Sequence, residues 1–276
     1  MTLQFTSLTP QSFSQASLLG RGRTAEVYLW GELHVLKLFY DGWPEENVQR
    51  EWAISQVISQ AGLTAPATGE LIRLGSQHGI VFERVNGKSL LNQFAAHPWS
   101  LFGAARLLAG LHAEMHSKTI PDLPSQRQQI QNLIRRAPTL APRIRSLALE
   151  RLDMLPDGET VCHGDYHPDN VMVTPHGPVI IDWNSASQGN PLADVAYTSL
   201  LLQVATPPPS GSIRQFLMNG GRTLAQEIYL SHHRRLTGTR QETINAWALP
   251  IAAARLGWGV PDETDRLQKY LISRTI

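Results

Sequence analysis

The sequence has very little cysteine, no large excess of one charge and no long uncharged apolar run. Its single cysteine, Cys162, excludes an intrachain disulfide bond and a zinc site built from several cysteines. The formal net charge of +1 gives no general reason to expect a nucleic acid or a membrane surface as a partner. No stretch approaches the roughly 20 apolar residues of a membrane-spanning helix.

Targeting signals are also missing from the start of the chain. Met1–Pro10 has no basic region followed by an apolar run, so we expect no signal peptide. Together with the single cysteine, this favours the reducing cytoplasm. What remains is an ordinary globular composition, 42% hydrophobic and 17% charged in 276 residues, enough for one large domain or two lobes.

Most of the chemistry lies in two neighbouring stretches. The polar run His163–Asn170 lies between apolar segments, and an apolar strand ending in Asp182 follows shortly after. Asp165 can accept a hydroxyl proton, Asn170 offers an amide oxygen to a metal ion, and Asp182 can bridge metal and phosphates. These are the groups that a magnesium-dependent phosphoryl transfer from ATP to an alcohol requires.

The spacing of these residues is also informative. Asn170 follows Asp165 by five positions, and Asp182 follows Asn170 by twelve. This spacing, and the form His-Gly-Asp-x-His-x-x-Asn followed by Ile-Asp-Trp, resembles the aminoglycoside phosphotransferase and choline kinase group of small-molecule kinases. The resemblance implies a protein-kinase-like fold in which Asp165 is the catalytic base, Asn170 and Asp182 bind magnesium, and His163 braces the loop.

Three alternatives use the same residues. His163, Asp165 and His167 alternate, so on an extended strand they would share one face and could hold a transition metal for hydrolysis. That interpretation leaves Asn170 and Asp182 without a role. A pseudokinase-like module would hold nucleotide without transfer, but no catalytic residue is missing. A solvated turn would not explain why apolar strands bring these polar residues to a shared centre.

The first 85 residues predict a small nucleotide-binding lobe. A turn containing Gly20 and Gly22 precedes two further strands, and glycines let backbone N–H groups approach phosphates closely. Lys37 lies inside the apolar strand 34–40. Strand alternation could turn it to solvent, whereas the functional interpretation is a lysine that holds the ATP phosphates and needs an acidic partner.

A helix that begins near Pro44 supplies candidate partners for Lys37. Glu51 lies near the middle of this helix and is our choice over Glu45, Glu46 and Glu70. Two further strands end in Phe82–Gly87, which resembles the hinge between kinase lobes. The resemblance implies that the Glu83 carbonyl and the Val85 N–H bind the adenine edge.

The expected fold is therefore α+β and two-lobed. Residues 1–85 form a small lobe with an antiparallel five-stranded sheet and one helix, and residues 86–276 form a mainly helical catalytic and substrate-binding lobe. We expect helices there near 127–136, 142–155, 213–236 and 241–257. His112 and His116, four positions apart on another helix, could bind a metal, although such a pair beside a core face is usually structural.

The segment Asn190–Ala196 resembles the Asp-Pro-x-x-Asp-Leu-Ala element of the same family. Its Asp194 is expected to cap a helix or to hold the backbone of the catalytic loop. Only twelve positions separate it from Asp182, too few for the activation segment with which a protein kinase docks a peptide. The acceptor is therefore expected to be a small molecule with a hydroxyl group.

The charge of the C-terminal region bears on the acceptor. Residues 200–276 contain nine Lys and Arg but five Asp and Glu, an excess of four positive charges. A pocket for a polycationic aminoglycoside should be lined by carboxylates. The count favours a neutral or anionic metabolite over an antibiotic.

Overall fold

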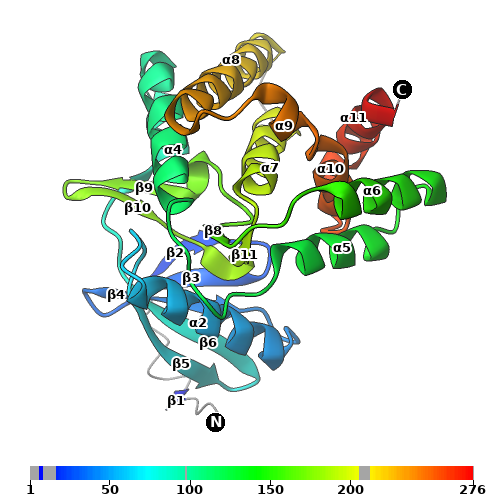
Figure 1. Ribbon diagram of the computed structural model, residues 1–276. Coiled ribbons are helices and arrows are strands. Elements are labelled where there is room, and N and C mark those ends of the chain that lie inside the picture. The colour runs from blue at the N-terminus through cyan, green and yellow to red at the C-terminus, as the bar shows by residue number, and fades with distance from the viewer. Residues whose placement is uncertain (1–5, 9–16, 97, 205–211, 276) are drawn as a thin grey trace. The chain divides into compact units, whose positions relative to one another are not determined.

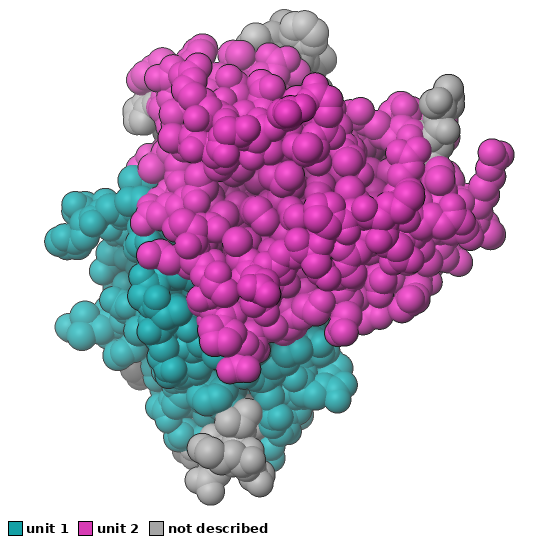
Figure 2. Space-filling view, in the orientation of Figure 1, with its two compact units in different colours: residues 1–89, 171–185 teal, residues 90–170, 186–276 magenta. Residues whose placement is uncertain are grey.

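The computed structural model of the protein describes residues 6–8, 17–96, 98–204 and 212–275. The chain forms two compact units, one of residues Met1–Ser89 and Val171–Ser185 and one of residues Leu90–Asn170 and Ala186–Ile276 (Figure 2). The continuous lobes predicted from the sequence, 1–85 and 86–276, differ from these units in where they place residues 86–89 and 171–185. Most of Met1–Pro10, where we expect no signal peptide, lies outside the described residues.

The first unit is built on a sheet with the strand order β1-β5-β6-β4-β3-β2. Its strands are β1 (Thr6–Leu8), β2 (Leu18–Arg21), β3 (Ala25–Trp30), β4 (His34–Phe39), β5 (Thr68–Leu74) and β6 (Gln77–Glu83). Strands β2 to β6 pair antiparallel, which confirms the predicted five-stranded sheet. The sequence did not indicate β1, which pairs parallel to β5 at its other edge.

Strand alternation divides the first unit into two apolar layers. Helix α2 (Glu45–Gln60) places Val48 against one face of the sheet, where Phe39 and Ile80 are buried. Leu36 and Leu38 belong to a separate cluster with Ile72, Leu74 and Val81. Because neighbouring strand residues point to opposite faces, Lys37 lies on the same face as Phe39, the face that α2 covers.

A small second sheet completes the first unit. It contains β7 (Lys88–Ser89), β9 (Val171–Thr174) and β10 (Gly177–Ile180), in the order β10-β9-β7. The N–H of Ile180 donates to the Thr64 carbonyl at 2.8 Å, and the 3₁₀ helix η3 (Trp183–Ser185) lies against α2. The chain between β10 and η3 carries Asp182, so this sheet brings Asp182 into the first unit.

The second unit is mainly helical (Figure 1). Its helices are α3 (Leu90–Ala96), η1 (Pro98–Ser100), α4 (Leu101–Met115), α5 (Gln126–Arg136), α6 (Pro142–Met154), η2 (Pro168–Asn170), α7 (Pro191–Val204), α8 (Ser212–Thr237), α9 (Gln241–Asn245), α10 (Ala248–Leu256), η4 (Pro261–Glu263) and α11 (Thr264–Thr275). Strands β8 (Thr160–Cys162) and β11 (Ser187–Gly189) pair antiparallel. Helix α7 packs against α8, α9 and α10 and is buried along most of its length.

The helix expected over residues 241–257 is wrong in one respect, because the structure divides it into α9 and α10. Ala246 and Trp247 still donate backbone hydrogen bonds to Glu242 and Ile244, but Asn245 ends α9. Pro250 lacks an N–H, and as the third residue of α10 it lies in a first turn that needs none. The proline therefore favours a new helix start over an uninterrupted helix.

Among the described helices, none combines the length and the apolar character needed to cross a membrane.

Candidate active site

In the first unit, Lys37 joins side chains from three separate segments. Its Nζ lies 2.7 Å from Glu51 Oε1 on α2 and 2.8 Å from Asp182 Oδ1, which follows β10. Glu51 is thus the glutamate that pairs with Lys37, whereas its rival Glu45 contacts Arg73 at 3.1 Å. The Lys37 side chain is 16% exposed, so strand alternation does not turn it to solvent.

Burial and charge act against each other in this cluster. Burial disfavours the Lys37 ammonium, but the carboxylates of Asp182 and Glu51 outweigh it and raise the pKa of Lys37 above its usual value. Burial also raises the pKa of Glu51, although Lys37 opposes this. The cluster therefore holds a permanent cation between two carboxylates.

Asp182 has a backbone conformation that few residues adopt. Its φ of +63° is in the left-handed region, which Asp tolerates better than most residues with a side chain. Asn184 donates its Nδ2 to Asp182 Oδ1 at 3.1 Å, and the Trp183 indole donates to the Ile180 carbonyl at 2.9 Å. These contacts hold the turn that aims the carboxylate at Lys37.

In the second unit, the loop of residues 163–170, which the sequence predicts to be catalytic, leaves β8 after Cys162. Gly164 has φ +77°, a conformation that favours glycine, and it lets the chain turn before Asp165. The Asp165 N–H donates to His163 Nδ1 at 3.3 Å, and Asn170 Nδ2 donates to the Asp165 carbonyl at 3.0 Å. His163 is buried. The two hydrogen bonds therefore hold the Asp165 backbone at both its N–H and its carbonyl.

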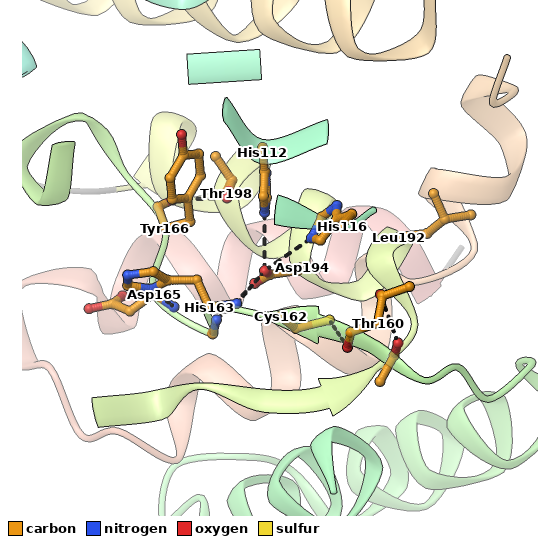
Figure 3. A network of polar contacts seen from close by, with 12 residues as sticks. His112, His116, Thr160, Cys162, His163, Asp165, Tyr166, Leu192, Asp194 and Thr198 are labelled. Atoms are coloured by element: carbon orange, nitrogen blue, oxygen red, sulfur yellow. Dashed lines mark hydrogen bonds and ion pairs between the residues drawn. The ribbon is translucent and has the colours of Figure 1, made fainter. Parts of the chain in front are cut away.

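Asp194, in the first turn of α7, holds the backbone of this loop (Figure 3). Its Oδ2 accepts from the His163 N–H at 2.6 Å, and its Oδ1 accepts from the Gly164 N–H at 2.9 Å. His112 Nε2 and His116 Nε2 lie 3.0 and 3.3 Å from Oδ2. The expectation that Asp194 holds the loop backbone is confirmed.

The charge state of this anchor follows from its burial. Burial alone would raise the pKa of Asp194, but hydrogen bonds from His112 and His116 hold it well below its usual range. Burial and the neighbouring His116 lower the pKa of His112 to about 3, so His112 is neutral at pH 7. Its Nε2–H then donates to Asp194, and its Nδ1 accepts from the Tyr229 hydroxyl at 2.6 Å.

Two residues that the sequence did not single out also position the loop. The hydroxyl of the buried Tyr166 donates to the Leu108 carbonyl at 3.0 Å, and Thr198 Oγ1 donates to the Tyr166 carbonyl at 2.9 Å. Helices α4 and α7 thereby fix the residue beside Asp165. No short-range pattern marks Tyr166 or Thr198, because their partners lie 58 and 32 positions away.

Metal binding by histidine was one alternative. Within the described ranges, the only cluster of at least three His, Cys, Asp or Glu with suitable spacing is His112, His116 and Asp194, whose ligand atoms lie within 4.8 Å of one another. The hydrogen bonds of Asp194 favour an anchor there. The set His163, Asp165 and His167 does not gather in this way, and His167 Nε2 lies 3.8 Å from Asp165 Oδ2.

The residues expected to contact the nucleotide all lie in the first unit. Gly20 is in β2, and the N–H of Gly22 donates to the Ala25 carbonyl at 2.8 Å to close the turn. Glu83 is the last residue of β6, with its side chain exposed, and Val85 follows in the connection to β7. These placements are compatible with backbone contacts to a nucleotide.

The two expected magnesium ligands have suitable chemistry. Asn170 donates a hydrogen bond from its Nδ2 to the Asp165 carbonyl, and its amide Oδ1 takes no part in that hydrogen bond. Asp182 offers a carboxylate that is 36% exposed. Amide and carboxylate oxygens are the ligands that magnesium prefers, so both residues fit the ion.

Comparison with known proteins places the chain in a family. The model of the phosphotransferase enzyme family matches residues 15–225. Comparison with curated protein sequences finds no match.

Solved structures with the same fold include several kinases. An aminoglycoside-3'-phosphotransferase of type VIII is 16% identical, with a TM-score of 0.62, over 87% of this chain and 93% of that one. A thermostable mutant of aminoglycoside phosphotransferase APH(4)-Ia, bound to ADP and hygromycin B, is 16% identical, with a TM-score of 0.63. The match covers 96% of this chain and 94% of that one.

Choline kinase from Cryptosporidium parvum is 15% identical, with a TM-score of 0.56, over 95% of this chain and 89% of that one. At this level of identity these likenesses show the fold, which is protein-kinase-like. Since the family model covers most of the chain, this protein belongs to the phosphotransferase enzyme family.

Proposed function

We propose that the protein transfers the γ-phosphoryl group of ATP to a hydroxyl group of a small molecule, with magnesium. The observation that carries this proposal is the Lys37 ammonium held between Glu51 and Asp182, at 2.7 and 2.8 Å. A lysine paired with a helical glutamate, next to a metal-binding carboxylate, is what kinases use to position phosphates. The match to the phosphotransferase family supports the same reaction.

Each proposed residue has a defined task. Gly20 and Gly22 let the backbone of their turn approach the phosphates closely, and Glu83 and Val85 offer backbone groups to the adenine edge, so residues 1–85 serve the nucleotide. Lys37, held by Glu51, orients the phosphates. Residues 86–276 serve the acceptor and the catalytic loop.

The transfer itself is assigned to the catalytic loop. The alcohol oxygen forms a bond to the γ-phosphorus, the bond from that phosphorus to the bridging oxygen of ADP breaks, and Asp165 takes the hydroxyl proton. His163 braces the loop, and Asn170 and Asp182 supply oxygen ligands for magnesium, which neutralises phosphate charge when bound. Positioning and charge neutralisation account for most of the rate in such reactions.

The test is acceptor-stimulated release of ADP over a panel of small alcohols. The panel includes gentamicin, streptomycin and hygromycin B, which are named with solved relatives, together with choline, neutral sugars and hydroxy acids. We expect a neutral or anionic alcohol to stimulate ADP release, because the C-terminal region has nine basic and five acidic side chains.

Asp165→Asn should lower stimulated turnover by about 10³-fold or more, because the amide cannot take the proton, and leave ATP affinity nearly unchanged. The control is Asp153→Asn, on the exposed face of α6, which should behave as the wild type. Full turnover in the Asp165→Asn variant would refute the role of base. ATP binding without stimulation by any alcohol would favour a pseudokinase-like module.

A further inference from the structure

A buried arginine lies beside the proposed base. Arg255 is in α10, and its side chain is 8% exposed. Its Nη1 lies 3.5 Å from Asp165 Oδ1, in an ion pair within the second unit. The roles proposed above do not include this residue, although it is the cation nearest to Asp165 among the described contacts.

Other side chains hold Arg255 in a single orientation. Its Nε and Nη2 donate to the two oxygens of Glu263 at 2.7 and 2.9 Å, a bidentate pairing. Its Nη1 donates to the Tyr197 hydroxyl at 2.8 Å, from α7. Because three nitrogens are fixed from two sides, the guanidinium faces Asp165 without freedom to rotate.

The two oxygens of Asp165 have different surroundings. Oδ1, which faces Arg255, is buried and accepts no hydrogen bond from the residues that the structure describes. Oδ2 lies on the side of His167, whose Nε2 is 3.8 Å away, and the side chain as a whole is 24% exposed. A buried oxygen needs a compensating charge, and Arg255 supplies it.

We propose that Arg255 is a positioning residue for Asp165. Held by Glu263 and Tyr197, it attracts Oδ1 and so directs Oδ2 toward the acceptor hydroxyl. This inference rests on the proposed function, because it assumes that Asp165 is the base. It adds a residue that sets the orientation of that base.

The same contacts limit the charge of the acceptor. Glu263 and Asp165 both face the Arg255 cation, so neither is a spare carboxylate for an ammonium group. A polycationic acceptor needs spare carboxylates next to its reacting hydroxyl. These two acids therefore add nothing to the binding of a polycationic acceptor, in agreement with the expected neutral or anionic alcohol.

The test compares Arg255→Gln, Arg255→Lys and a control, Arg143→Gln, at an exposed position on α6. The probes are water, as basal ATP hydrolysis, and the most active alcohol of the panel. Arg255→Gln should lower kcat for the alcohol by about 10- to 100-fold with KM for ATP within about twofold, since a misplaced base costs this much. Arg255→Lys should recover part of the loss, and Arg143→Gln should lose nothing.

A structural role and a positioning role differ in one measurement. In an Asp165→Asn background, Arg255→Gln should cause no further loss of residual turnover, because the base that it orients is gone. An equal fold loss in both backgrounds would overturn the proposal. If Arg255→Gln does not fold, Glu263→Gln keeps the volume, loosens Arg255 and should give a smaller loss of kcat with the same dependence on Asp165.

Failure of the proposed function can be told apart from failure of this inference. Absence of stimulated ADP release in the wild type would refute the kinase proposal alone. Crystal structures of wild type and Arg255→Gln then test the orientation directly. If Asp165 Oδ1 lies in a different position in Arg255→Gln, the inference is supported. An unchanged Asp165 rotamer in that variant overturns it.

Discussion

At the scale of single residues, Lys37 shows how a charged group is kept inside a protein. It lies in β4 on the face that α2 covers, where an unpaired ammonium would be unfavourable. Glu51 and Asp182 supply two carboxylates, of which Asp182 has the left-handed φ of +63°. An uncommon backbone conformation at a charged cluster is typical of functional sites.

Lys37→Met should impair both catalysis and stability. Removing the ammonium takes away the cation that lies 2.7 Å from Glu51 and 2.8 Å from Asp182. The free energy of unfolding should fall by about 2 kcal/mol, below the loss for a fully buried pair because Asp182 is 36% exposed. We expect a rise of about tenfold in the Kd for ATP and a large loss of turnover, measured by urea unfolding, calorimetry and ADP release.

The control for this change is Lys269→Met, at an exposed position of α11. It should leave stability, ATP affinity and turnover unchanged. Wild-type ATP affinity and turnover in Lys37→Met would contradict the assignment of Lys37 to the phosphates.

At the scale of elements, one close backbone contact allows β7 and β9 to pair. Gly87 precedes β7, and a Cβ built on it would lie 2.4 Å from the Val173 carbonyl oxygen of β9. The pairing of Lys88 with Val173 and of Ser89 with Met172 depends on this approach. The glycine therefore permits the small sheet that leads to Asp182.

Gly87→Ala should destabilise the protein by about 2 kcal/mol, because the added methyl group must displace backbone rather than a flexible side chain. Urea unfolding measures the change. The matched control is Gly110→Ala within α4, where a Cβ would meet nothing within 4 Å. That substitution should stabilise by about 0.5–1 kcal/mol, since alanine is the better helix former. Equal stability of the two variants would argue against the close approach.

Element prediction succeeded where the local pattern was strong, and it failed at one local exception and at one strand that depends on a distant partner. Alternation and helical spacing marked β4, α2 and α5 to within a few residues. The division of 241–257 followed from Pro250, a single residue within an apolar helical pattern. β1 depends on pairing with β5, more than 60 positions further along the chain, so no short stretch predicts it.

At the scale of the whole molecule, buried histidines make stability depend on pH. Burial lowers the pKa of His112 to about 3 and that of His233 to about 4, and His116 adds to both shifts. The unfolded chain, with histidine pKa values near 6.5, binds more protons than the folded chain between these values. The stabilisation is therefore complete above about pH 6.5 and is lost as the pH falls toward 4 and then 3.

Acidification from pH 7 to 5 should lower the free energy of unfolding by about 2 kcal/mol for each of these two histidines, at 1.36 kcal/mol per pKa unit. The low pKa of Asp194 adds a loss in the same direction at more acid pH. Urea unfolding at several pH values measures the effect. A stability that is flat between pH 7 and 5 would contradict neutral, buried histidines.

His233→Phe should remove about half of this acid sensitivity. Neither ring nitrogen of His233 has a hydrogen-bond partner in the described part of the chain, so an apolar ring of similar size leaves none of these groups unsatisfied. His176→Phe, in the exposed turn between β9 and β10, is the control and should keep the wild-type pH dependence.

The sequence by itself predicted the two-lobed fold with its five antiparallel strands and the choice of Glu51 as partner of Lys37, and it proposes the residues of a catalytic loop. Alternation and helical periodicity marked the strands and helices. The resemblance to small-molecule kinases implied the two lobes, the roles of the loop residues and the pairing of Lys37 with a helical glutamate. Arg255 left a weak signal, since a lone charge in the apolar run 248–256 needs a partner if it is buried.

Only the tertiary structure decided which partner each of these groups has. Arg255 meets Asp165 across 90 positions of sequence, and His112 meets Asp194 across 82. The left-handed φ of Asp182 and the hydrogen bonds that fix Tyr166 likewise depend on neighbours from other elements. The physical reason is that buried polar groups must be satisfied by whatever group the fold places beside them, and sequence separation does not limit that choice.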